Sequence, residues 1–198
     1  MTYGQIYLAG PDVFLPNAVA ISAAKRELCT KYQFVGLSPL DNELDVSKLP
    51  KRAAAQQISA SNEAMIRQCD LVIANVTPFR GPSADVGTVY EMGFARALGK
   101  PVLAYSNAPG NFLERTRDAL GARVRRRASG QLEDAFHMAI EDFDCVENLM
   151  IDGAVTHDGP GIVVNPTPED RRYTDLAAFE ECLRLAHKLY VGRGSGET

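Results

Sequence analysis

Short apolar segments suited to β-strands alternate with longer helix-like segments along the first half of the chain. The strand-like segments are QIYLA (5–9), FVG (34–36), DLVIANV (70–76) and PVLAY (101–105), and helices are expected over about 17–32, 53–69 and 86–98. Parallel strands joined by helices form a sheet that is covered on both faces. We therefore expect an α/β fold with a doubly wound parallel sheet, of flavodoxin-like or Rossmann-like type, with helices on both faces.

The pattern is weaker in the second half of the chain. We expect an apolar segment at 145–154, a Gly/Pro-rich loop over 156–168, and helices over about 112–120, 132–140 and 174–190. With 198 residues and 45% hydrophobic content, the chain can bury one sizeable core. We expect one domain over residues 1–191, followed by a disordered tail over 192–198.

Composition and motifs argue against several classes of protein. The net charge of −4 disfavours a nucleic-acid-binding surface, and the basic cluster RVRRR (123–127) is expected to be a solvated loop or helix end. No apolar run approaches the length of a membrane span, and the N-terminus lacks a signal peptide. The four cysteines are far apart and form no CxxC motif, as in reduced cytosolic proteins. We expect a cytoplasmic protein that binds neither nucleic acid nor membranes.

Ligands of such sheets bind beyond the carboxyl ends of the strands. The segments that follow those ends contain one obvious cation, Arg80, and five carboxylates, namely Asp12, Asp41, Glu43, Asp85 and Glu91. Neither GxGxxG nor GxxxxGK[ST] occurs, so dinucleotide and triphosphate sites lack support. An acidic pocket with one guanidinium suits a neutral polar ligand. A divalent metal is the weaker alternative, because the carboxylates are scattered and come without histidine; we expect no metal and no cofactor.

Glu91 is the most unusual of these carboxylates. It lies in the segment 87–98, which is otherwise nearly all apolar or small, and helical spacing places it on a face with little else that is polar. A surface Glu at the edge of an apolar stripe is the ordinary explanation. Three features favour a site: Asp85 can cap the helix start, Gly87 and Gly93 remove side-chain bulk, and the segment follows a strand and a loop.

Four sequence blocks resemble the nucleoside 2-deoxyribosyltransferases. They are IYLAGPDVF (6–14), CDLVIANVTPFRG (69–81), DVGTVYEMGFARALGKPV (85–102) and NLMIDG (148–153). Enzymes of this family move 2-deoxyribose from one nucleobase to another through a covalent sugar–enzyme intermediate. The resemblance therefore implies 2′-deoxynucleosides and free nucleobases as substrates. The segments SPLDNE, VTPFRG and IEDFDCVENLM are closer to the purine-preferring branch of the family.

The resemblance also implies catalytic roles. Glu91 matches the nucleophile, which attacks C1′ of the sugar, so that two inversions give net retention. Tyr7 is the candidate for a hydroxyl that hydrogen-bonds the carboxylate. Asp70 and Asp85 match two active-site aspartates that would protonate or hydrogen-bond the leaving base. Simpler roles compete with these, since Asp70 suits a helix-to-strand turn and Asp85 suits a helix N-cap.

Further positions match substrate contacts of the family. Phe14 would pack against the sugar or base, Asn62 could contact the sugar, and Arg80 and Gly81 could shape the base pocket. Ordinary core packing for Phe14, a solvated helix position for Asn62 and a surface loop for Arg80 are the competing explanations.

The motif NLM implies an oligomer. In the family this segment reaches the active site of a neighbouring subunit, where the Asn amide binds the 5′-hydroxyl of the sugar. Asn148 and Met150 would then complete a neighbour's site, which requires a homo-oligomer of at least two subunits. Burial of this apolar segment within its own subunit is the alternative.

Two other functions stay open. The related N-glycosidases hydrolyse 2′-deoxynucleosides or their 5′-monophosphates and surround the phosphate with small hydroxyl residues, for which Ser83 and Ser106 are available. A nucleotide-binding module without turnover is the third possibility, although such a module has no use for a nucleophile. The stretch 107–140 is longer than the family pattern, and it is either a lid over the base or a surface elaboration.

Overall fold

The computed structural model describes residues 2–42, 44–156 and 161–194. Its main sheet has five parallel strands in the order β2-β1-β3-β4-β7. The strands are β1 (Gly4–Ala9), β2 (Phe34–Leu37), β3 (Leu71–Asn75), β4 (Val102–Ser106) and β7 (Val163–Val164). This is the flavodoxin-like order, whose direction reverses between β1 and β3. The expected α/β fold with a doubly wound parallel sheet is confirmed.

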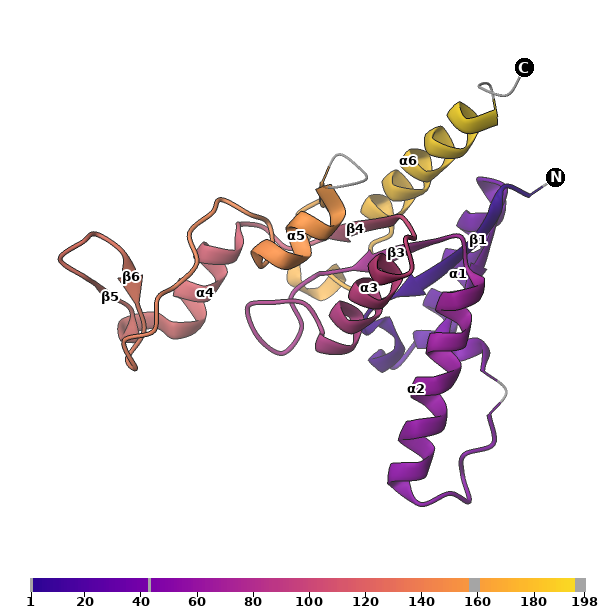
Figure 1. Cartoon of the computed structure of the whole chain (residues 1–198), viewed down its shortest axis with the longest axis horizontal. Helices are drawn as coiled ribbons and strands as arrows, with labels where there is room; N and C mark the ends of the chain where they lie inside the picture. Colours follow the sequence, from indigo (N-terminus) through magenta and orange to yellow (C-terminus); the bar gives the residue numbers. More distant parts are fainter. Residues whose placement is uncertain (1, 43, 157–160, 195–198) are drawn as a thin grey trace.

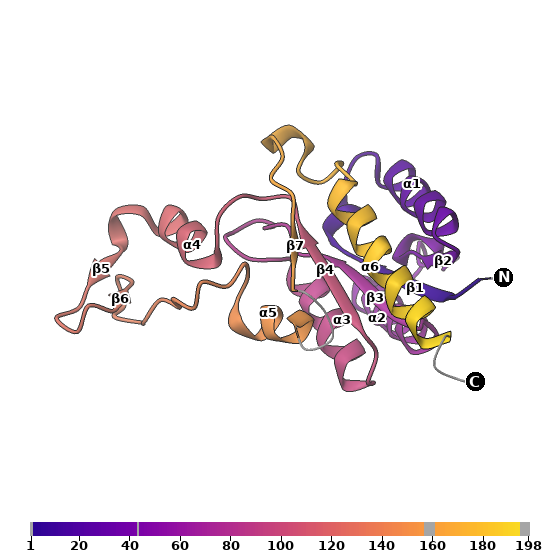
Figure 2. The same ribbon diagram turned by 90° about the horizontal axis from the view of Figure 1, so that it is seen from above.

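Helices cover both faces of the sheet (Figure 2). On one face lie α1 (Ala18–Lys31) and α6 (Ala177–Gly194), and on the other lie α2 (Lys51–Gln68), α3 (Val86–Ala97) and α5 (Leu149–Thr156). Both central strands, β3 and β4, are buried along their whole length, which is why their sequences are apolar without alternation. None of the described helices combines the length and the apolar character that crossing a membrane would require.

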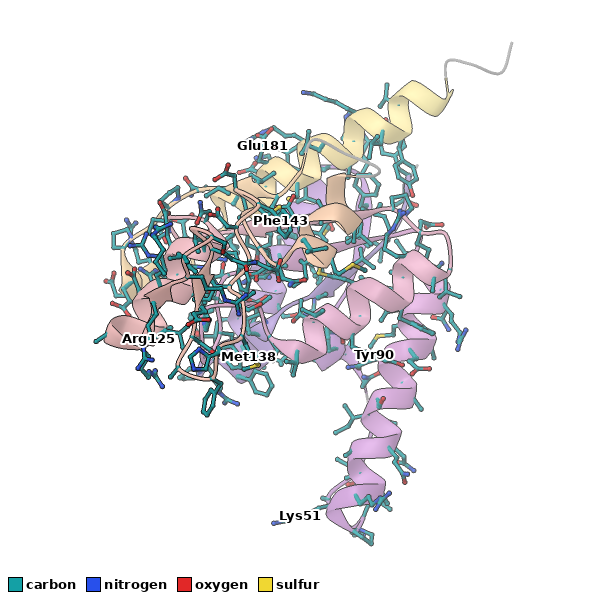
Figure 3. The ribbon with its side chains drawn as sticks, turned by 60° about the vertical axis from the view of Figure 1, so that its left-hand side comes forward. Lys51, Tyr90, Arg125, Met138, Phe143 and Glu181 are labelled. Atoms are coloured by element: carbon teal, nitrogen blue, oxygen red, sulfur yellow. The ribbon has the colours of Figure 1, made fainter. Side chains whose placement is uncertain are left out.

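Helix α2 reaches far beyond the edge of the sheet, and Lys51 marks its remote end (Figures 1 and 3). The loop between β2 and α2 returns alongside it after a short 3-10 helix, η2 (Pro39–Asp41). The loop between β2 and α2 therefore lies at the edge of the sheet where strands β1 and β3 end.

The helix expected over 132–140 is wrong. This segment contains β6 (Leu132–Glu133), which pairs antiparallel with β5 (Arg125–Arg126), so the basic cluster lies partly in a hairpin. The Asp134 side chain accepts hydrogen bonds from the backbone N–H groups of Phe136 (2.8 Å) and Met138 (3.0 Å). Such local bonds offer the backbone an alternative to a helix.

The last part of the chain differs from expectation in two further places. Strand β7 lies within the segment expected as a loop, and it pairs with the end of β4. Helix α6 continues to Gly194, into the segment expected as a disordered tail, and residues 195–198 of that tail lie outside the described residues.

Residues 112–145 form an arm that projects away from the sheet (Figures 1 and 2). It contains α4 (Phe112–Leu120) and the β5–β6 hairpin, and its exposed apolar side chains are Phe136, Met138 and Phe143 (Figure 3). The two ends of the arm meet, because the Phe112 N–H donates to the Cys145 carbonyl at 3.0 Å.

An ion pair anchors the base of the arm. The Arg115 guanidinium lies 3.0 Å from the carboxylate of Glu147, which is fully buried, and it also donates to the Pro82 carbonyl at 2.9 Å. The Ser83 hydroxyl donates to the same carboxylate at 2.6 Å. The loop before α3, the arm and the segment before α5 are therefore held together at one buried carboxylate.

A second buried ion pair lies where β1 and β3 end. Lys25 of α1 pairs with Asp12, and the Asn75 amide donates to Asp12 at 3.0 Å. Gly10 makes room for this cluster, since a Cβ atom there would lie 2.7 Å from Asp12 Oδ2 and 2.9 Å from Asn75 Cβ. The cluster fixes the turn that follows β1.

Replacing Lys25 with alanine is expected to lower the free energy of unfolding by about 3–5 kcal/mol, because it leaves the buried Asp12 carboxylate without its partner. Lys31→Ala on the same helix is the matched control, since Lys31 pairs with Glu180 at the surface and its loss should change stability little. Urea unfolding followed by circular dichroism measures both, and equal losses would contradict the prediction.

Candidate active site

A cavity of about 430 Å³ opens where β1 ends, between the loop after β2 and the start of α3. Most of its lining is apolar, and Glu91 and Asp85 are the two carboxylates among the described residues that line it. The lining residues are Gly10, Val13, Phe14, Pro39, Leu40, Asn42, Leu44, Val46, Ile58, Asn62, Asp85, Gly87, Thr88 and Glu91. Its volume falls within the range of small-molecule sites.

Glu91 and Tyr7 meet in the wall of this cavity. Tyr7 is fully buried in β1, and its hydroxyl donates to Glu91 Oε1 at 2.6 Å. Asn62 of α2 donates to the same oxygen at 3.4 Å. Burial raises the pKa of Glu91 to about 7, the negative charge of Asp85 adds to this, and the hydrogen bonds from Tyr7 and Asn62 oppose it. Burial and the nearby carboxylate raise the pKa of Tyr7, so the hydroxyl remains a donor.

Asp85 caps the N-terminus of α3. Its Oδ2 accepts hydrogen bonds from the Thr88 N–H at 2.9 Å and the Thr88 hydroxyl at 3.1 Å. Among the described residues, none donates to Oδ1, which leaves that oxygen available beside the cavity. The N-cap role expected of Asp85 is therefore present, together with a position at the cavity.

Two aromatic rings and a guanidinium form a cluster of which one member, Phe14, lines the cavity. Phe14 stacks on Phe79 with ring centroids 5.3 Å apart, and the Arg80 guanidinium lies over both rings, at 5.2 and 4.5 Å. Arg80 has a positive φ of 56°, an uncommon conformation for a residue with a side chain. Gly81 is exposed, lies outside the cavity lining and has no neighbour within 4 Å of the place of a Cβ atom.

The model of the family described as nucleoside 2-deoxyribosyltransferase matches residues 6–150. The chain belongs to this family. A solved 2-desoxiribosyltransferase from Leishmania mexicana is 31% identical with a TM-score of 0.58, and the match covers 89% of this chain and 97% of that one. The resemblance in the four sequence blocks is confirmed.

Two relatives in the curated collection extend the comparison. An uncharacterized protein of Schizosaccharomyces pombe is 29% identical over 186 residues, which cover 87% of this chain and 88% of the relative. The 5-hydroxymethyl-dUMP N-hydrolase of Mus musculus is 31% identical over 132 residues, which cover 64% of this chain and 70% of the hydrolase. A transferase and a hydrolase thus both resemble this deoxyribosyltransferase-family chain.

The role expected for Asp70 is wrong in this fold. Asp70 precedes β3, at the amino end of the strand, whereas the cavity lies beyond the carboxyl end of β1. Its Oδ2 accepts the Gln5 N–H at 2.7 Å, so its side chain joins the starts of two neighbouring strands. The competing explanation, a turn residue between helix and strand, describes it correctly.

The expected acidic pocket is also corrected. Asp12 is bound by Lys25 and Asn75, and Asp41 pairs with Arg26 and lies outside the cavity lining. Glu43 lies outside the described residues. In the described part of the chain, no three His, Cys, Asp or Glu side chains gather as metal ligands would.

Asn148 and Met150 lie away from Glu91 within the chain. Asn148 begins α5, where its Oδ1 accepts the Met150 N–H at 3.0 Å and its amide donates to Glu141. Met150 is 73% exposed and lines a separate groove between α3 and α5. Neither residue lines the cavity, so one chain alone does not bring them to the nucleophile.

Sequence analysis missed the contribution of the loop over 38–50. Asn42 hydrogen-bonds Asn62, and Leu40, Leu44 and Val46 line the cavity. The position of this segment after the end of a strand could have indicated a place at the site. The loop prediction relied on its turn-forming residues and gave no role to the apolar residues between them.

Proposed function

We propose that this member of the family moves 2-deoxyribose between nucleobases through a covalent ester on Glu91. A Glu91 oxygen attacks C1′ of the deoxynucleoside, the C1′–N bond breaks, and its electron pair leaves with the base. The leaving base takes a proton from Asp85, the second carboxyl group at the cavity. The observation that carries this proposal is the carboxylate of Glu91, hydrogen-bonded by Tyr7 and lying at a cavity whose lining is mostly apolar.

The second half of the reaction reverses the first with another base. Its ring nitrogen attacks C1′ from the opposite face, the ester bond breaks, and Glu91 recovers its electron pair. The incoming base gives its proton to Asp85. Two inversions yield net retention at C1′. The apolar lining keeps water from the ester, so that a base can compete with hydrolysis.

Purine preference is the finer part of the proposal. The Phe14 ring lines the cavity and is 57% exposed, so it offers a face on which a base can stack. The larger purine face gains more from such a contact than a pyrimidine does. Arg80, packed over Phe14 and Phe79, would fix the stacking ring and contact the edge of the base.

Hydrolysis of a 2′-deoxynucleoside or its 5′-monophosphate is the second candidate, favoured by the likeness to the mouse N-hydrolase. Two observations count against a 5′-phosphate. The lining of the cavity contains no Lys, Arg or His among the described residues. Ser83 donates its hydroxyl hydrogen to Glu147, Ser106 is fully buried at the end of β4, and neither residue lines the cavity.

The site would be completed by a second subunit. Met150 is exposed and Asn148 is half-buried at the start of α5, and neither residue lines the cavity of its own chain. We propose that they close the sugar end of a neighbour's cavity, with the neutral Asn148 amide on the 5′-hydroxyl.

The four cysteines are free thiols, which suits the reducing cytoplasm where we place this activity.

Incubation with deoxyinosine and adenine tests the proposal. The expected products are deoxyadenosine and hypoxanthine, separated by chromatography, with little free deoxyribose. Free deoxyribose as the main product, at a rate that added adenine does not change, would instead establish a hydrolase. Tight binding of the nucleoside without any product would establish a binding module.

The pH dependence of base release follows from the ionisation of Glu91. The nucleophile must be ionised, so the rate of base release should rise as the pH increases toward about 7. Tyr7→Phe removes a hydrogen bond that lowers the Glu91 pKa, so the rising limb should move to higher pH. The rate of hypoxanthine release in a single turnover, measured against pH, tests this. The same rising limb in Tyr7→Phe and in the wild type would contradict the assignment of this ionisation to Glu91.

A further inference from the structure

Asn42 begins a chain of side-chain hydrogen bonds that ends on Glu91. Its Nδ2 donates to the Pro39 carbonyl at 3.1 Å and to Asn62 Oδ1 at 3.0 Å. The Asn62 amide nitrogen then donates to Glu91 Oε1 at 3.4 Å. The loop after β2 is thereby connected to a catalytic group on α3 through one residue of α2.

The direction of this chain is fixed at its start. A backbone carbonyl can only accept, so Asn42 must present its NH2 group to Pro39 and to Asn62. Asn62 must accept this hydrogen bond with its side-chain oxygen, which leaves its NH2 group to donate to Glu91. If the Asn62 amide were reversed, two donors would face each other and its oxygen would lie against the carboxylate. The ionised Glu91 carboxylate already favours the NH2 group of Asn62, and Asn42 adds a second contact that favours the same orientation.

Other contacts make Asn42 a firm support. The Ser61 hydroxyl donates to Asn42 Oδ1, so both ends of the Asn42 amide are bonded. The preceding turn is held by Ser38, whose N–H donates to Asp41 at 2.8 Å, and by the pairing of Asp41 with Arg26. Asn42 therefore sits at the end of a braced turn, against the cavity.

We propose that Asn42 is a positioning residue for the nucleophile, which holds the Asn62 amide with its NH2 group toward Glu91. It touches neither the sugar nor the base in this role and acts through Asn62. The inference deepens the proposed function, since it concerns the same carboxylate.

Among the described residues, two titratable groups act on Glu91: Tyr7 from β1 and Asp85 from the start of α3. Cys69 in turn acts on Tyr7. A change at Asn42 leaves all of these in place. An altered ionisation of Glu91 in an Asn42 variant is therefore attributable to Asn62 or to a charge introduced at position 42.

The test uses the substitutions Asn42→Ala and Asn42→Asp in the full chain. Alanine removes the donor without adding charge, and aspartate can only accept, so it draws the Asn62 NH2 group away from Glu91. The Glu91 carboxyl is titrated by carbon-13 NMR without substrate, and its signal is identified by its absence from Glu91→Gln. We expect the titration to move to higher pH in both variants, and further in Asn42→Asp.

Kinetics give the second readout. At pH 6, base release by Asn42→Asp should be about tenfold slower than in the wild type, because each unit by which the Glu91 titration moves changes the ionised fraction about tenfold. At pH 9 the two rates should be similar. Ser47→Ala is the control on the same loop, because Ser47 bonds Asp45 and lies outside the cavity lining. It should match the wild type in both measurements.

A double-mutant cycle separates positioning from a general effect on folding. In an Asn62→Ala background, Asn42→Ala should cause no further displacement of the Glu91 titration. A full additional displacement there, or an unchanged titration in Asn42→Ala alone, would overturn the inference. Because the titration needs no turnover, a wild type that is inactive on nucleosides but shows this coupling would refute the proposed function and leave Asn42 as a positioning residue.

Discussion

Glutamine in place of Glu91 is expected to lower the rate of deoxyribosyl transfer by at least about a thousandfold, as loss of a catalytic nucleophile does. The glutamine oxygen can still accept the hydrogen bond from Tyr7, so the wall of the cavity is retained. The neutral amide, however, cannot form the ester with C1′. The exchange of adenine for hypoxanthine on deoxyinosine measures the loss.

Glu63→Gln is the matched control for this variant. Glu63 lies on α2 beside the same helix α3, where it accepts a hydrogen bond from Tyr90 at 2.6 Å, but it does not line the cavity. The control should retain transfer at close to the wild-type rate. Activity above a few per cent in Glu91→Gln would rule out Glu91 as the nucleophile.

Stability supplies an independent check on Glu91→Gln. The Glu91 pKa is raised from 4.5 to about 7 in the folded protein, so the folded state keeps a proton that the unfolded state releases in this window. The ionisation of Glu91 therefore lowers the stability of the wild type as pH rises from 4.5 to about 7, and the glutamine variant lacks this contribution. Above pH 7 the variant should be the more stable of the two, and near pH 4 they should melt alike.

Mixing two inactive variants is expected to restore activity. Glu91→Ala lacks the nucleophile, and Asn148→Ala lacks the amide that we assign to the sugar of a neighbour's site. In a closed dimer assembled at random from equal amounts, about a quarter of the sites contain both wild-type residues. Activity should therefore rise from near zero to about that fraction.

The mixture needs proof that subunits have exchanged. Different affinity tags on the two variants allow the mixed oligomer to be isolated by sequential purification before the assay. The unmixed variants, treated in the same way, provide the baseline. Mixed oligomers without activity would place the function of Asn148 in its own subunit or outside the site.

The local patterns of the sequence were enough to predict strands β1 to β4 of the sheet, but not β7. Strands β3 and β4 are buried on both faces, so their residues are apolar throughout, and the helices between them show helical spacing. The helix expected over 132–140 was wrong because the spacing of apolar residues does not show when a side chain competes for backbone N–H groups. Here the Asp134 side chain accepts hydrogen bonds from two backbone N–H groups of its own turn.

The site was predicted less evenly. Tyr7 and Glu91 are 84 residues apart, and only the family resemblance brought them together before the structure placed them 2.6 Å apart. Asp70 matched by residue type, but its place depends on strand direction, and it precedes β3 at the edge of the sheet opposite the cavity. Asn42 lies in the segment SPLDNE, but its resemblance to the family assigned no role to this residue. Its role comes from the path of a loop that folds back against α2.

The hydrogen bond between Phe112 and Cys145 has a consequence for how such chains diversify. The Phe112 N–H and the Cys145 carbonyl oxygen are 3.0 Å apart, so the two ends of the arm are held together. The arm is therefore attached to the rest of the protein as a closed loop. The entropy of closing a loop grows only slowly, by about 0.6 kcal/mol for each doubling of its length. Beyond Arg115, the arm can therefore be lengthened, shortened or exchanged with little effect on the sheet. Insertions and deletions between homologues should concentrate there, while the spacing from Tyr7 to Glu91 stays nearly constant.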